Sequence, residues 1–141
     1  MTAHRLFLRG TSVALLLGIL GTGCGKGEEC QKARLEASRA WQTVTTQAGE
    51  AELKGPPDFD ELPQPQKAEH TKQWRDVKTQ SELVSSSFTY ERITWKTADP
   101  AREKTNVLFN GYSAKSEFPV FTAALKSANQ RFEDAGKLCR D

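Results

Sequence analysis

Apolar residues recur at steps of three and four from residue 30 onward, a spacing that places them on one face of a helix. The first stretch predicts a helix from Cys30 to Leu53, because Gly55-Pro56-Pro57 cannot continue it. Residues 54–65 hold four prolines in twelve residues and are predicted to form a loop. The apolar seam of this first helix consists of Cys30, Ala33, Ala37, Ala40, Trp41, Val44, Ala48 and Ala51.

Two further helices are predicted between this loop and residue 111. The second starts near Pro65, and the serine run 85–87, which has poor helix propensity, allows a break. The third starts at Asp99-Pro100, with Asp99 as N-cap and Pro100 at the first helical position, so the chain is expected to reverse at 97–99. Its end is expected at Asn110-Gly111. The seam of the second helix is His70, Trp74, Val77, Ser81, Val84, Phe88 and Trp95.

A last helix is predicted to open within 116–119, since proline is tolerated in a first turn, and to run to Cys139. Its seam is Phe121, Ala124, Leu125, Ala128, Phe132, Ala135 and Cys139. No stretch alternates with the period of two that a strand would show. The sequence therefore predicts an all-α fold, a small antiparallel helical bundle with four helices as the expected number.

The N-terminal segment has a different character. Arg5 and Arg9 precede the eight-residue apolar run 13–20, which is too short to cross a bilayer because a spanning helix needs about 20 apolar residues. Small residues then lead to Cys24. This order resembles a bacterial lipoprotein signal, although that pattern usually has leucine where Gly21 stands. The resemblance implies cleavage before Cys24 and acylation of its thiol, and the alternative is an ordinary secretion signal that ends near a cysteine.

The resemblance also implies a domain organisation and a location. Residues 1–23 form the signal peptide, 24–29 a short tether and 30–141 the helical domain. The mature protein is expected to be held at a membrane of the cell envelope by its lipid, facing the periplasm. Gly25, where an aspartate would retain a lipoprotein in the inner membrane, resembles the outer-membrane sorting pattern of enteric bacteria.

Charge argues against a nucleic-acid partner. Arg5 and Arg9 are the only basic residues before Cys24, so residues 24–141 hold 18 of the 20 Lys and Arg and all 18 Asp and Glu. A net charge of zero gives no attraction for phosphate backbones. The expected contacts are the membrane, through the lipid anchor, and an envelope protein partner.

The cysteine count bears on both the anchor and the fold. Three cysteines in an exported protein leave one unpaired, and acylation of Cys24 would leave Cys30 and Cys139 to form a disulfide. Two free thiols, or a Cys24–Cys30 pair, are the alternatives. Because Cys30 starts the first helix and Cys139 ends the last, a bridge requires an even number of helices in an up-down bundle.

Catalytic and metal-binding motifs are not found in the mature sequence. Its one histidine, His70, falls on the apolar seam and is interpreted as a core residue rather than a general base. No set of ligands has metal-binding spacing, and neither a haem-attachment motif nor a glycine-rich phosphate loop occurs there. No enzymatic activity, cofactor or metal is predicted, and an envelope enzyme without a recognisable motif stays open as an alternative.

Seven aromatic residues are expected to fill the core: Trp41, Trp74, Trp95, Phe88, Phe118, Phe121 and Phe132. Large side chains facing the small seam residues would pack to normal density. The alternative is that these rings line a pocket, which would make the protein a carrier of a small apolar ligand.

By elimination, the sequence favours a protein-binding accessory or scaffold domain. A proline-rich loop loses little entropy on binding, and the loop and the turn after Gly111 are expected to lie together at the end far from the membrane. The predicted partner-binding residues are Asp58, Phe59, Asp60, Glu61 and Leu62, with Tyr112. The alternative is a plain connector in which Phe59 and Leu62 pack against the helix ends.

Overall fold

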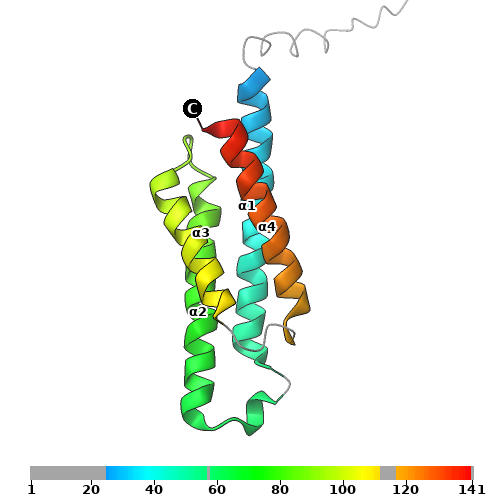
Figure 1. Cartoon of the computed structure of the whole chain (residues 1–141), viewed down its shortest axis with the longest axis vertical. Coiled ribbons are helices and arrows are strands. Elements are labelled where there is room, and N and C mark those ends of the chain that lie inside the picture. Colours follow the sequence, from blue (N-terminus) through cyan, green and yellow to red (C-terminus); the bar gives the residue numbers. More distant parts are fainter. Residues whose placement is uncertain (1–24, 57, 112–116, 141) are drawn as a thin grey trace, which may run out of the picture.

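The computed structural model describes residues 25–56, 58–111 and 117–140. Over these ranges the chain forms antiparallel helices and no strand, which confirms the predicted all-α bundle of four helices. Successive helices run in opposite directions, so the first and third helices end, and the second and fourth begin, toward the same end of the bundle (Figure 1). The elements are α1 (Gly25–Lys54), the 3₁₀ turn η2 (Phe59–Glu61), α2 (Gln64–Ser87), α3 (Trp95–Asn110) and α4 (Pro119–Cys139).

Helix α1 is the central element, because it packs against both α2 and α4, while α3 packs on α2. Its inward face is made of small residues and one large one, Trp41, which is fully buried. Polar pairs fill part of the interface between α1 and α2: the hydroxyls of Thr45 and Ser81 lie 2.9 Å apart. The periodicity of small seam residues therefore predicted the buried face of α1 correctly.

The aromatic residues pack on one another in the core, as expected. Six of the seven are buried: Trp41, Trp74, Phe88, Phe118, Phe121 and Phe132. The ring of Trp74 lies 4.7 Å from that of Phe118 and 4.8 Å from that of Phe121, between centroids. Trp95 differs, because it is only half-buried and lies at the edge of the cluster.

Helices α3 and α4 are joined chiefly by long side chains. Asn106 and Asn129 exchange amide hydrogen bonds of 3.1 and 2.8 Å. Arg102 donates to the Asn129 side chain at 2.9 Å and to Glu133 at 2.7 Å, and its guanidinium lies 4.6 Å from the centre of the Phe132 ring. Together with the contact between the Phe109 and Phe121 rings, whose centroids are 4.7 Å apart, this network holds α3 to α4.

A disulfide joins Cys30 near the start of α1 to Cys139 at the end of α4. The two Cα atoms are 4.9 Å apart, within the usual range for a disulfide. The predicted pairing and the even number of helices are thus both confirmed. We call this end of the bundle the disulfide end, and the end that carries η2 the distal end.

The predicted start of the first helix was too late. Helix α1 begins at Gly25, so residues 25–29 of the predicted tether are helical. Extending an existing helix costs far less than nucleating one, and Glu28 in the first turn complements the helix dipole. The start of α2 at Gln64 and of α4 at Pro119 agree with the predictions, and so does the end of α3 at Asn110.

The predicted reversal at 97–99 was wrong. The chain reverses over 88–94 and α3 begins at Trp95, so Pro100 is the sixth residue of the helix and Asp99 is not its N-cap. The rings of Phe88 and Trp95 pack edge to face with centroids 5.8 Å apart, which closes the turn between them. Asp99 instead accepts two hydrogen bonds from Arg140, beyond the end of α4.

Candidate functional site

The distal end is shaped by a turn at Gly55. This residue has a φ of +66°, the left-handed conformation in which glycine avoids the cost of a side chain. The Phe59 ring packs directly on it, since a Cβ at position 55 would lie 2.3 Å from Phe59 Cγ. The turn therefore folds η2 back against the helix ends.

His70 lies beneath this turn, buried among aromatic rings. Its ring centroid is 5.1 Å from that of Phe59, 6.2 Å from Phe118 and 6.3 Å from Trp74. Its Nε2 lies 3.4 Å from the carbonyl oxygen of Ala51, which makes Nε2 the donor. His70 thus belongs to the core, as predicted, and links α1, η2, α2 and the start of α4.

Burial lowers the pKa of His70 below its ordinary value of 6.5. The hydrogen bond to the Ala51 carbonyl and the negative charge of Glu117 oppose this shift without reversing it. A neutral imidazole suits an aromatic environment, because a charged one would lose its hydration there.

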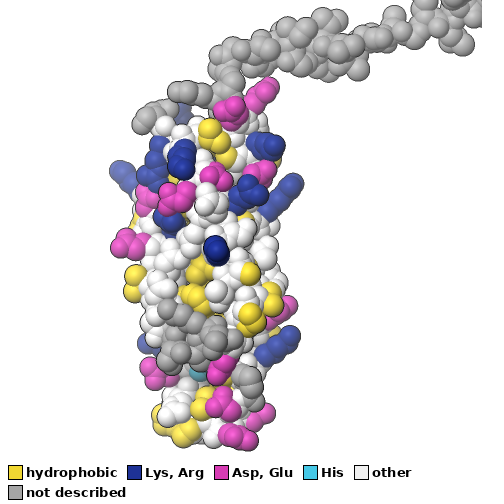
Figure 2. Space-filling model, turned by 45° about the vertical axis from the view of Figure 1, so that its right-hand side comes forward, with side chains coloured by type: hydrophobic (Ala, Val, Ile, Leu, Met, Phe, Trp, Pro, Cys, Tyr) yellow, Lys and Arg dark blue, Asp and Glu magenta, His cyan; other side chains and the backbone are white. Residues whose placement is uncertain are grey.

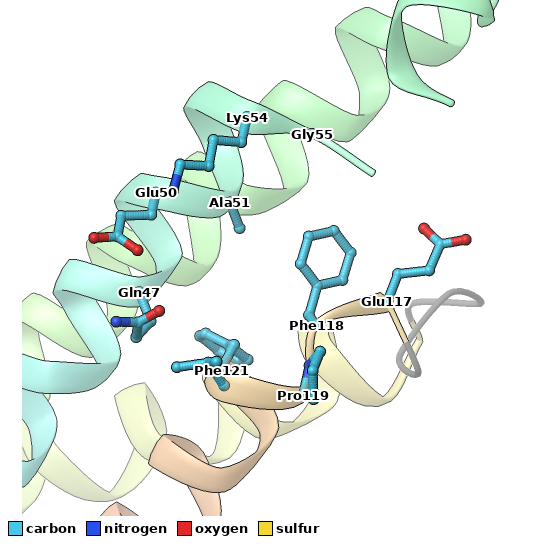
Figure 3. Close-up of a pocket in the computed structure, with 10 residues that line it drawn as sticks. Gln47, Glu50, Ala51, Lys54, Gly55, Glu117, Phe118, Pro119 and Phe121 are labelled. Atoms are coloured by element: carbon cyan, nitrogen blue, oxygen red, sulfur yellow. The ribbon is translucent and has the colours of Figure 1, made fainter. Parts of the chain in front are cut away.

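A groove of about 180 Å³ lies between the last turns of α1 and the start of α4. Phe118, directly before α4, and Phe121 of α4 extend toward Ala51 on the facing helix (Figure 3). Val120 also lines the groove and is 62% exposed. The groove has the size and the apolar walls to accept a side chain or a small apolar group.

Carboxylates surround the distal end. Asp58, Asp60 and Glu61 are exposed around η2, and Glu50 and Glu117 line the groove beside a single lysine, Lys54. Acidic side chains gather at the lower tip of the molecule in the view of Figure 2, whereas the basic side chains of that face lie higher. The distal end therefore combines an apolar groove with a negatively charged border.

The predicted partner-binding residues do not all face outward. Asp58, Asp60 and Glu61 are exposed, whereas Phe59 and Leu62 are half-buried. Phe59 packs against His70 and lies under the ammonium of Lys67, at 5.7 Å from its ring centre. Phe59 thus packs inward, as it would in a plain connector, while the same segment exposes three carboxylates to solvent. Tyr112 and Cys24 lie outside the described residues.

The groove was not predicted. Its two walls come from residues 47–55 and 117–121, which are far apart in the sequence and share no motif. The one available signal was Val120, an apolar residue beside the seam position Phe121 and off the inward face.

In the described parts of the chain, no group of three or more His, Cys, Asp or Glu side chains is arranged to hold a metal ion. Among the helices that the structure describes, none is both long and apolar enough to cross a bilayer.

The chain was compared with protein-family models, with curated proteins and with solved structures. None of these comparisons finds a match.

Proposed function

We propose that this protein is a lipid-anchored domain of the cell envelope that binds another envelope protein through its distal end. The supporting observation is the course of α1 from Gly25 to Lys54. A helix of 30 residues is about 45 Å long, so the residue next to the expected lipid attachment at Cys24 lies a bundle length away from the groove. An anchor at Cys24 would therefore be expected at the end of the bundle opposite the binding surface.

The chemistry of the distal end indicates the kind of partner. An apolar side chain of the partner would enter the groove between Ala51 and Phe118, and basic residues beside it would face Glu50 and Glu117. Such an arrangement places an apolar anchor at the centre of an interface and complementary charges at its edge. The partner segment is therefore expected to be apolar at one position and basic around it.

Anchoring is tested by membrane fractionation of the wild-type chain and of Cys24→Ser, combined with mass measurement of the mature N-terminus. The wild type should carry acyl groups on Cys24 and remain with the membrane. A processed Cys24→Ser protein that stays in the membrane fraction to the same extent would contradict lipid anchoring.

Partner binding is tested by affinity purification from solubilised membranes with two matched variants. Val120→Glu places a charge in the groove, and Val107→Glu places the same charge on α3, at a valine that is also 62% exposed. We expect a stoichiometric partner to be lost from Val120→Glu and retained by Val107→Glu. Neutralising Asp58, Asp60 and Glu61 together should weaken the same complex, most clearly at low salt. Retention of every partner by both distal variants would contradict the proposal.

A further inference from the structure

The disulfide end carries a second depression, of about 640 Å³, that the proposed partner binding does not use. Its apolar lining is formed by Trp95, Ile93 and the Cys30–Cys139 disulfide. Three arginines from three separate segments border it: Arg34 from α1, Arg92 from the 88–94 connection, and Arg140, which follows α4. The depression therefore joins an apolar surface to a concentration of guanidinium groups.

The three arginines differ in whether a carboxylate neutralises their charge. Arg140 is paired with Asp99, and its guanidinium stacks 3.9 Å from the centre of the Trp95 ring. Arg34 donates from Nη1 to the carbonyl oxygens of Tyr90 and Glu91, at 3.2 and 3.0 Å. These bonds hold its side chain in place without neutralising its charge.

Arg34 and Arg92 have no carboxylate within ion-pairing distance in the described part of the chain. Nε of Arg34 is moreover buried there without an acceptor, so the hydrogen-bonding capacity of this guanidinium is incompletely used. One carboxylate, Glu91, lines the same depression and reduces its positive charge. Two uncompensated guanidiniums against one carboxylate leave a local excess of positive charge.

Guanidinium groups recognise phosphate through paired N–H donors, and an adjacent apolar surface suits the glycerol and acyl part of a lipid. The position of the depression near the start of α1 also suits a membrane lipid. Cys30 is five residues beyond Gly25, about 7.5 Å along the helix axis, so the depression would lie close to the bilayer that holds an acylated Cys24.

We propose that this depression binds the phosphate group of an anionic phospholipid, with Arg34 and Arg92 as its phosphate ligands and with Ile93 and Trp95 on its apolar side. The choice of a membrane lipid over free phosphate rests on the proposed anchoring. Binding there would hold the disulfide end against the membrane surface and direct the distal end away from it.

The test is a titration of the purified full-length protein with dihexanoylphosphatidylglycerol, kept monomeric, while tryptophan emission is recorded. Trp95 is half-buried in the depression and the other two tryptophans are buried in the core, so a saturable change would report on Trp95. Arg92→Gln and Arg34→Gln should each weaken binding several-fold, and Glu91→Gln should strengthen it. Arg39→Gln, an exposed arginine of α1 that does not border the depression, is the matched control and should bind normally.

Dihexanoylphosphatidylcholine and inorganic phosphate complete the experiment. Weaker binding of both supports an anionic phospholipid. Equal binding of the choline lipid, or no effect of Arg92→Gln on this exposed loop, would overturn the proposal, and equal binding of inorganic phosphate would assign the site to free phosphate instead. Absence of acylation at Cys24 would contradict the anchoring alone, since it leaves the titration unchanged.

Discussion

Ser38 of α1 and Ser85 of α2 each donate a hydrogen bond from their hydroxyl to the backbone carbonyl of the other, at 3.4 and 3.2 Å. This reciprocal pair is buried and requires the two helices to approach closely.

Ser85→Leu should lower the free energy of unfolding by about 1–3 kcal/mol, because a larger side chain would force the helices apart. Chemical denaturation checks this, with the exposed neighbour Ser86→Leu expected to stay within about 0.5 kcal/mol of the wild type.

Alanine substitutions at two glycines should change the stability of the protein in opposite directions. Gly55→Ala should destabilise by about 1–2 kcal/mol or more, because alanine strains the left-handed conformation and its Cβ would collide with the Phe59 ring. Gly49→Ala should stabilise by about 0.5–1 kcal/mol, since Gly49 is inside α1 and a Cβ there meets only the Lys78 side chain at 3.8 Å. Thermal unfolding of both variants in one buffer is the measurement. A Gly55→Ala protein as stable as the wild type would contradict the described turn.

His70 should make stability depend on pH below neutrality. Because burial lowers its native pKa below 6.5, the unfolded chain binds more protons than the native one between the two pKa values. The free energy of unfolding should therefore fall as the pH decreases from 6.5 through the native pKa. His70→Gln removes this ionisation, so its stability should fall less over the same range, as measured by denaturant titrations at pH 7.5, 6.5 and 5.5. Parallel losses in both proteins would exclude His70 as the cause.

Removal of the disulfide should be costly. The double variant Cys30→Ser/Cys139→Ser is expected to lose about 2–5 kcal/mol, the usual range for a native bridge in a small exported domain. Mass mapping of a non-reduced tryptic digest should recover the fragments that contain Cys30 and Cys139 as one joined species. Recovery of both cysteines as free thiols from protein made in an oxidising compartment would contradict the pairing.

The fold could be predicted where local periodicity and tertiary packing agree. Trp41 and Phe132 recur on their seams at helical spacing and are buried, and the positions of Cys30 and Cys139 set the parity of the helices. The reversal of the chain over 88–94 could not be predicted from the periodicity. Phe88 and Trp95 are seven residues apart, a spacing that an uninterrupted helix would also produce.

The candidate site was only partly predictable for a different reason. The acidic residues of 58–61 are recognisable because charge and proline content are local properties of a sequence. The groove depends on the meeting of the last turns of α1 with the start of α4, and no local pattern specifies which helix ends will meet. The arginine-bordered depression likewise combines Arg34, Arg92 and Arg140, which are separated by more than 40 residues at each step.

The bridge between Cys30 and Cys139 closes a covalent ring around almost the whole folded domain, with 109 residues of sequence separation. A protease that cuts one peptide bond inside this ring opens it without dividing the molecule, so both pieces stay joined through sulfur. The C-terminal part of a nicked chain would then remain attached to whatever holds the N-terminus. Complete release would require a second cut or a reductant, which makes the folded unit tolerant of a single proteolytic event.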